Sequence, residues 1–234
     1  MTGLRAVLFD TYGTLVDWRS SLLDELAAFG RARGLARDWA AFLAAWKACY
    51  RPGMDAVNRD EIPWTTIETI YGRRLMEMLR AHAIEASPED VQRLTHAWWR
   101  LRPWPDTLPG LARLKTRYVI SPLSNASFAG MVNLAKFAGL PWDCVITAEN
   151  ARRYKPHVDV YRTALGLLGL EASEVMLAAA HNYDLAAAQA LGLRTAFVPR
   201  PLEYGPGQTT DLVAEGKWDV VVDSVDELAA ALGC

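Results

Sequence analysis

The chain has 234 residues, of which 51% are hydrophobic and 22% charged, and its 25 Lys+Arg against 27 Asp+Glu give a formal charge of −2. This composition excludes a disordered chain, a collagen and a disulfide-stapled scaffold, and the near-neutral balance predicts no nucleic-acid or membrane partner. The three cysteines are widely spaced without a CxxC pair, which argues against a disulfide framework or a thiolate metal site. With no apolar run long enough for a signal peptide or a membrane span, we expect a soluble, cytoplasmic protein.

Short apolar runs along the chain predict buried strands. Residues 5–9 form the first run, which ends at Asp10 and is followed by the turn-forming sequence Thr-Tyr-Gly-Thr. Comparable runs occur later, at residues 118–123, 145–147, 175–180, 194–198 and 218–222. Helical patterns, such as residues 158–168 and 185–191, lie between most of them. This alternation predicts a Rossmann-like α/β fold, with a parallel sheet covered by helices on both faces.

Residues 19–101 interrupt this alternation, because they are rich in Ala, Leu and Trp and helical in period. Three prolines follow, at positions 103, 105 and 109, and disfavour continuation of a helix. We therefore predict a core domain made of residues 1–18 and 102–234, with an α-helical cap domain of residues 19–101 inserted into it. Ligands of open parallel sheets bind beyond the carboxyl ends of the strands, where such a cap would cover them.

Polar side chains follow four of the predicted strands. They are Asp10 after the first, Ser124 and Asn125 after the second, Lys155 after the third, and His181 and Asp184 after the fourth. Each has an ordinary structural interpretation on its own: a turn residue, a helix cap or a surface lysine. Together, at the same edge of one sheet, they predict a single site that handles an anion.

Four short segments carry a resemblance to a known family. Phe9-Asp10-Thr11-Tyr12-Gly13-Thr14-Leu15, Leu123-Ser124-Asn125-Ala126-Ser127, Tyr154-Lys155-Pro156 and His181-Asn182-Tyr183-Asp184 resemble the four ordered motifs of the haloacid dehalogenase superfamily. The resemblance is closer to its L-2-haloacid dehalogenase branch. It implies hydrolysis of short 2-haloalkanoic acids to 2-hydroxy acids through an ester on Asp10, with the small acid and the halide ion as its small-molecule partners.

Two differences separate the chain from phosphatases that resemble this family. Tyr12 stands where they carry a second Asp, and Ala179 and Ala180 stand in the segment where they carry acidic Mg²⁺ ligands. Mg²⁺ prefers six oxygen ligands, whereas only Asp10 and Asp184 are plausible carboxylates here. We therefore expect a reaction without metal or other cofactor.

The resemblance assigns further roles near Asp10. Lys155 would hold the Asp10 carboxylate in its ionised form, since an opposite charge favours ionisation. Asp184, which matches the family, or His181, where many members have Asn, would position or deprotonate the hydrolytic water. Tyr161 matches a family tyrosine near the site, although a helix residue at this position can equally belong to the core.

The substrate carboxylate needs hydrogen-bond donors at the strand ends. By resemblance, Ser124 and Asn125 supply them together with the backbone N–H of Thr11 or Tyr12. A simple alternative for Ser124 is the N-cap of the following helix. Thr14 is expected to hydrogen-bond around the nucleophile.

The leaving halide needs a cation, which family members supply as an Arg from an early cap helix. Lys47 stands at that position here, and a Lys lacks the planar fork of Arg. Arg51, one helical turn further on the same face, is the alternative. Trp64 is expected in an aromatic wall that excludes water. The loop of residues 199–207, rich in Pro and Gly, has no role that the sequence indicates.

Three alternatives to the dehalogenase hypothesis stay open at this stage. They are a metal-dependent phosphatase, a hydrolase acting on another small carboxylate, and a binding protein without catalytic activity. The oligomeric state is also open, with a homodimer as our hypothesis.

Overall fold

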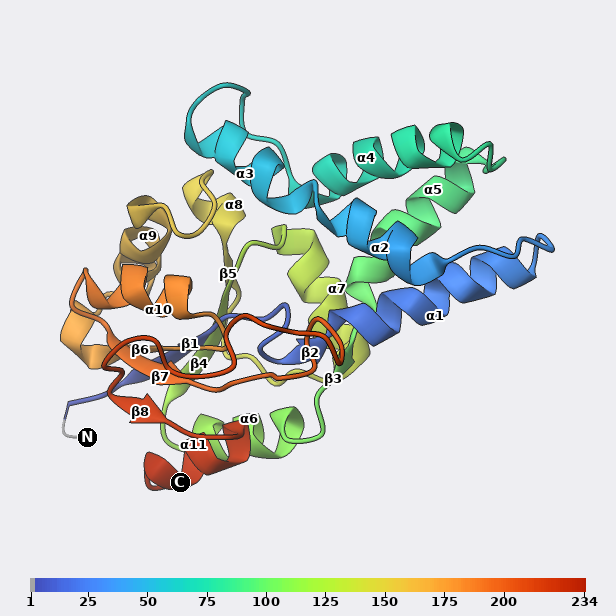
Figure 1. Ribbon diagram of the computed structural model, residues 1–234. Helices are drawn as coiled ribbons and strands as arrows, with labels where there is room; N and C mark the ends of the chain where they lie inside the picture. Colours follow the sequence, from blue (N-terminus) through green and yellow to red (C-terminus); the bar gives the residue numbers. More distant parts are fainter. Residues whose placement is uncertain (1–2) are drawn as a thin grey trace.

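The computed structural model describes residues 3–234, and its centre is a six-stranded parallel sheet in the order β5–β4–β1–β6–β7–β8 (Figure 1). The strands are β1 (Ala6–Phe9), β4 (Val119–Ser124), β5 (Ile146–Thr147), β6 (Val175–Ala179), β7 (Arg194–Phe197) and β8 (Val220–Val221). Phe9, the last residue of β1, pairs with Pro122 of β4 and Ala178 of β6. The three central strands therefore end at the same edge of the sheet, and the predicted Rossmann-like α/β fold is confirmed.

Both faces of the sheet are covered, as the continuous apolar strands require. Side chains alternate along β1: Val7 and Phe9 pack in one cluster, while Ala6 and Leu8 pack in another. The first cluster includes α6 (Thr107–Lys115), α7 (Phe128–Ala138) and α11 (Val225–Ala231), and the second includes α9 (Val158–Leu168) and α10 (Asn182–Gln189).

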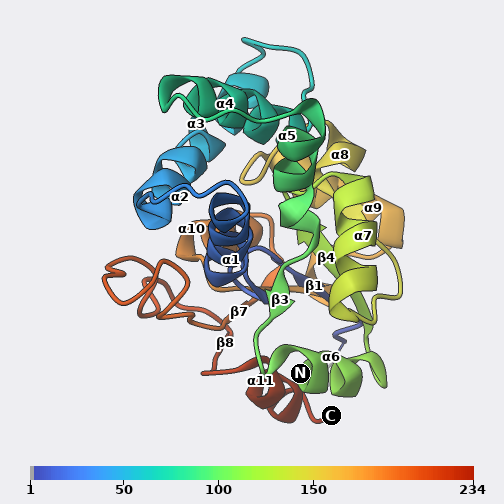
Figure 2. The same cartoon turned by 90° about the vertical axis from the view of Figure 1, so that its right-hand side faces the viewer.

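The sequence between β1 and β4 forms a helical segment. It consists of α1 (Trp18–Arg31), α2 (Trp39–Lys47), α3 (Tyr50–Asn58), α4 (Ile67–Ala81), α5 (Pro88–Thr95) and the 3₁₀ turn η1 (His96–Trp99). The chain enters and leaves it through an antiparallel pair, β2 (Val16–Asp17) and β3 (Arg102–Pro103). Figures 1 and 2 show α3 and α4 at the opposite end of the molecule from α6 and α11. The division of the chain into core and cap domains stays a prediction.

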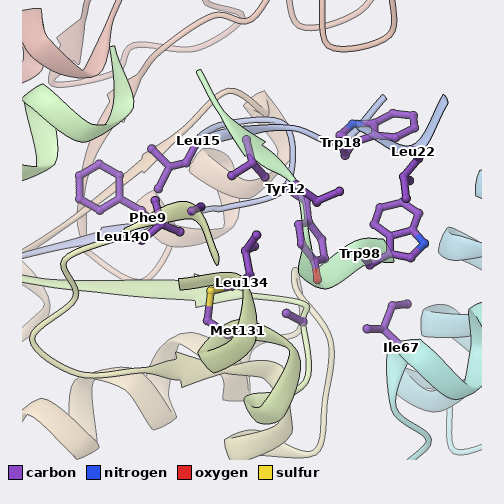
Figure 3. Packing of buried hydrophobic residues seen from close by; sticks show 14 of the residues in the cluster. Phe9, Tyr12, Leu15, Trp18, Leu22, Ile67, Trp98, Met131, Leu134 and Leu140 are labelled. Carbon is purple, nitrogen blue, oxygen red and sulfur yellow. The ribbon is translucent and has the colours of Figure 1, made fainter. Parts of the chain in front are cut away.

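An aromatic cluster joins the helical segment to the sheet (Figure 3). The Trp98 ring stacks on Trp18 at 5.9 Å and on Tyr71 at 4.2 Å between centroids, and it contacts Tyr12 of the β1 turn at 5.6 Å. Trp98 is 1% exposed. Because rings of this size bury a large apolar area, the cluster fixes the helical segment above the ends of the strands.

Several predicted boundaries differ from the observed ones. The run at residues 218–222 yields only two strand residues, and the helix expected at residues 185–191 begins earlier, at Asn182. The N-cap of α7 is Ser127, whose hydroxyl accepts a hydrogen bond from the Gly130 N–H, so the N-cap alternative for Ser124 is wrong. Within residues 3–234, no helix is both long and apolar enough to cross a membrane.

Candidate active site

Asp10 lies directly after β1, at the edge where the central strands end. Its backbone N–H donates to the Ala178 carbonyl at 3.0 Å, which continues the pairing with β6. The Thr14 hydroxyl donates to Asp10 Oδ2 at 2.7 Å and itself accepts from the Ala180 N–H at 2.9 Å. The predicted contact between Thr14 and Asp10 is therefore present, and it orients the carboxylate.

Lys155 brings a cation to the same carboxylate. Its Nζ lies 2.9 Å from Asp10 Oδ1 and 2.5 Å from Asp184 Oδ2, and the residue is 1% exposed. The Lys155 backbone N–H donates to Asn125 Oδ1 at 2.7 Å, while Asn125 Nδ2 faces the Lys155 carbonyl at 3.4 Å. The Asn125 amide is thus engaged in fixing the segment that carries Lys155.

Asp184 lies in the first turn of α10 and is fully buried. The Tyr161 hydroxyl, from α9, donates to Asp184 Oδ1 at 2.5 Å, and Lys155 occupies Oδ2. Tyr161 is itself fully buried. It therefore belongs to the core and also contacts the site, as each of the two sequence-based interpretations expected in part.

His181 is the N-cap residue of α10, but its side chain makes no capping hydrogen bond. Its Nδ1 lies 3.1 Å from Asp10 Oδ2, and its Nε2 lies 2.9 Å from Glu203 Oε2. The other Glu203 oxygen accepts from Trp18 Nε1 at 3.0 Å. The interpretation of His181 as a mere capping residue is therefore wrong.

Glu203 belongs to the loop of residues 199–207, for which the sequence indicated no role. Arg200 anchors this loop: its Nε donates to the Thr14 carbonyl at 2.8 Å, and its terminal nitrogens bind the Asp106 carboxylate at 2.8 and 2.7 Å. Gly13 has a φ of +90°, and a Cβ there would lie 2.2 Å from a Glu203 oxygen. The missing side chain of Gly13 therefore makes room for Glu203.

The environments of the two aspartates differ. Burial alone would raise the pKa of Asp10, but the charge of Lys155 and the hydrogen bond to His181 outweigh it and hold the pKa well below its usual range. Burial raises the pKa of Asp184 despite the opposing effect of Lys155. Asp10 is therefore fully ionised at neutral pH, as a carboxylate nucleophile must be.

The two basic groups beside Asp10 are held in their charged forms. Burial would lower the pKa of Lys155, but the Asp10 and Asp184 carboxylates raise it above its usual value. Burial would likewise lower the pKa of His181, but Glu203 and Asp10 raise it well above its usual range. The resting site thus contains an imidazolium between two carboxylates.

A cavity of about 300 Å³ opens beside Asp10. Five charged side chains line it: Asp10, Lys47, Arg51, His181 and Glu203. Four tyrosines add aromatic walls: Tyr12, Tyr50, Tyr183 and Tyr204. The combination of one ionised carboxylate, cations and apolar walls suits a small organic anion.

Lys47 is a half-buried cation within this cavity. Its Nζ lies 3.4 Å from the centre of the Tyr50 ring, and it donates to the Tyr71 hydroxyl at 3.3 Å. Burial lowers the pKa of Lys47 to about 8, although Glu203 and Asp10 act in the opposite direction. The second candidate cation, Arg51, also lines the cavity but pairs with Asp55 at 3.0 Å.

Some residues predicted for substrate binding lie elsewhere. Trp64 packs on the Tyr154 ring at 4.9 Å, and the Ser124 hydroxyl accepts from the Ala126 N–H at 3.3 Å; neither lines the cavity described above. The Tyr12 and Thr11 hydroxyls are buried without a hydrogen-bond partner among the described residues. Tyr12 contributes to the lining of the cavity.

Comparison with known proteins shows consistent similarities. A family model described as haloacid dehalogenase-like hydrolase matches residues 4–192. The (S)-2-haloacid dehalogenase 4A of Burkholderia cepacia is 28% identical over 218 residues, covering 86% of this chain and 87% of the relative. A solved L-2-haloacid dehalogenase is 45% identical with a TM-score of 0.96, covering 98% and 99% of the two chains. A defluorinating L-2-haloacid dehalogenase is 42% identical, also with a TM-score of 0.96, covering 99% and 96%.

Proposed function

Because the chain belongs to the haloacid dehalogenase-like hydrolase family, we propose that it hydrolyses short 2-haloalkanoic acids to 2-hydroxy acids through an ester on Asp10. The observation that carries this proposal is the ionised Asp10 carboxylate at the wall of a small cavity that also contains a cation, Lys47. The dehalogenases at 45% and 42% identity support the same reaction.

In the first step, an Asp10 oxygen attacks C2 of the substrate and displaces the halide. The hydrogen bonds from Thr14, Lys155 and His181 hold the carboxylate in place, which reduces the entropy lost on reaching the reactive geometry. Lys47 would stabilise the departing halide, with its aromatic neighbours keeping water away from the reacting atoms.

In the second step, water attacks the carbonyl carbon of the Asp10 ester. The C–O bond to Asp10 breaks, the 2-hydroxy acid leaves, and the carboxylate is restored. The substrate carboxylate would be bound by Arg51, which lines the cavity, and by the backbone N–H groups beside Asp10. We also propose that the reaction needs no metal ion and that the enzyme works in the cytoplasm.

The test measures halide and proton release from chloroacetate, L-2-chloropropionate and fluoroacetate, with and without EDTA. We expect release that EDTA does not change and that Asp10→Asn abolishes, while Asp24→Asn, an exposed matched change, leaves it intact. Activity lost on chelation would favour the phosphatase hypothesis instead. Release only after Lys47→Arg would indicate that the natural substrate is a small carboxylate without halogen.

A further inference from the structure

We propose that Glu203 is a positioning residue that holds His181 as the base for hydrolysis of the Asp10 ester. This inference rests on the function proposed above and deepens its second step. It assigns a role to a glutamate that the sequence motifs do not include, and it decides between His181 and Asp184 as the group that activates water.

The three side chains form a continuous hydrogen-bonded chain. Asp10 Oδ2 lies 3.1 Å from His181 Nδ1, and His181 Nε2 lies 2.9 Å from Glu203 Oε2. His181 is 6% exposed and Glu203 is 2% exposed. A nucleophile, an imidazole and an orienting carboxylate in this order have the geometry by which hydrolases position a general base.

Access to the cavity distinguishes the two candidate bases. His181 lines the cavity beside Asp10, whereas Asp184 is fully buried and does not. Both Asp184 oxygens already accept short hydrogen bonds, from Lys155 and Tyr161. A water that approaches the ester from the cavity meets the imidazole first.

The base becomes available only after the ester has formed. In the resting enzyme, the imidazolium donates to Asp10 through Nδ1–H and to Glu203 through Nε2–H. Alkylation neutralises Asp10 and thereby removes one of the two carboxylates that hold these protons. The Nδ1 proton then passes to cavity water, while Nε2–H stays bonded to Glu203 and fixes the tautomer.

His181 carries the protons of the hydrolytic step. The water oxygen forms a bond to Cγ of Asp10, and the water proton moves to His181 Nδ1. The ester bond from Cγ to the former Asp10 oxygen, now bound to C2, breaks, and the leaving alkoxide takes that proton to give the 2-hydroxy acid. Glu203 stabilises the imidazolium that exists between these two proton transfers. The second water proton then passes from the new Asp10 carboxyl group to His181 Nδ1, which restores the Asp10 carboxylate and the resting imidazolium.

Few other charged groups face the imidazole. Tyr183 of α10 lies beside it, with ring centroids 5.8 Å apart. Lys47 of α2 and Arg51 of α3 line the same cavity, and both oppose a positive charge on the ring. The Glu203 carboxylate is thus the one partner that remains on the ring nitrogens, among the described residues, once Asp10 is esterified.

The position of Glu203 is fixed from three sides. Trp18 Nε1 donates to its second oxygen, Gly13 leaves space for the carboxylate, and Arg200 ties the loop to Asp106. A group whose own position is fixed in this way can orient the imidazole accurately.

The test separates the two chemical steps by rapid mixing with a haloacid in excess. In Glu203→Gln, the first equivalent of halide should appear as in the wild type, whereas later turnover should slow by about 10²–10⁴-fold, the usual contribution of a general base. The pH midpoint of the second step should also fall, because the imidazole has lost an adjacent anion. Glu215→Gln makes the same change on an exposed side chain of the same connection, and it should match the wild type.

A second variant guards against misfolding and against a purely structural effect. His181→Asn keeps a polar contact with Asp10 but removes the base, so it should also release one equivalent and then stall. Adding Glu203→Gln to it should slow turnover little further, since both residues act through one imidazole. Unchanged turnover in Glu203→Gln, or an equal further loss in the double variant, would overturn the inference. If the wild type releases no halide from any haloacid, the proposed function itself fails.

Discussion

Lys155 Nζ lies 2.9 Å from Asp10 Oδ1, although 145 residues separate the two in the sequence. The side chains are 1% and 10% exposed, and the same ammonium contacts Asp184. Because a buried charge without a partner is costly, Lys155 stabilises both carboxylates at once.

We expect Lys155→Met to lose dehalogenation and to lower the free energy of unfolding by about 3–5 kcal/mol, since it leaves buried carboxylates uncompensated. Chemical denaturation at neutral pH measures the change. Lys115→Met removes a partly exposed pair with Asp143 and should cost less than about 1 kcal/mol. Equal losses of unfolding free energy in the two variants would show that the buried ion pair stabilises the fold no more than the partly exposed one.

The same pair gives a pH dependence of stability. The folded pKa of Asp10 is lower than the unfolded one, so its contribution is present above the unfolded pKa, about 4, and is lost as pH falls through the folded pKa. The free energy of unfolding should therefore decrease on acidification below pH about 4. The decrease should be smaller in Lys155→Met than in the wild type over the same pH range, because only His181 then lowers the pKa of Asp10 among the charged neighbours.

Tyr161→Phe removes the hydroxyl that donates to Asp184 Oδ1. We expect weaker activity, because the Asp184 carboxylate loses a partner and competes for Lys155. The matched change Tyr118→Phe removes a buried hydrogen bond to the Leu232 carbonyl, far along the chain from the motifs. It should cost about 1 kcal/mol of stability without changing kcat, and kcat measured for both variants distinguishes the two effects.

We expect the rate of halide release to decrease at alkaline pH, because Lys47 loses its charge there. Its pKa is lowered to about 8, so the side chain is charged below this pH and becomes neutral above it. Halide release should therefore fall as pH rises through about 8. Lys47→Arg keeps its charge at these pH values, so its kcat/KM should stay level over the same range. If kcat/KM of this variant decreased at alkaline pH as in the wild type, a group other than Lys47 would be responsible for the decrease.

Gly13→Ala should displace Glu203 and slow turnover, because the new Cβ would lie 2.2 Å from the Glu203 carboxylate. Gly34→Ala is the matched control, since that residue also has a positive φ, +65°, but has open space around it. Both changes introduce backbone strain of about 1–3 kcal/mol. Only Gly13→Ala should reduce turnover, as measured by steady-state halide release after both variants are shown to be folded.

The sequence predicts the fold and the motif residues well, because both depend on local patterns. Apolar runs of strand length identify the strands of the sheet. Because these strands are parallel, the side chains that directly follow them lie at the same edge of the sheet, whichever segments connect the strands. Asp10, Lys155, His181 and Asp184 are therefore brought together as predicted.

Contacts set by irregular connections could not be predicted in this way. Glu203 reaches His181 because Arg200 binds Asp106 and because Gly13 leaves room for a carboxylate. The sequence shows only that an arginine and a glutamate lie within a Pro- and Gly-rich loop. The position of Trp64 could not be predicted either. The sequence shows that an aromatic residue follows Pro63 but not that its ring packs on Tyr154.

In the proposed reaction, Asp10 is alkylated and water then attacks the carboxyl carbon of Asp10. A single turnover with enzyme in excess over L-2-chloropropionate, in water labelled with heavy oxygen, tests it most directly. We expect an unlabelled lactate hydroxyl and one heavy oxygen in the peptide that contains Asp10, as read by mass spectrometry. A labelled hydroxyl together with an unlabelled Asp10 would show direct attack of water on the substrate and would rule out the ester on Asp10.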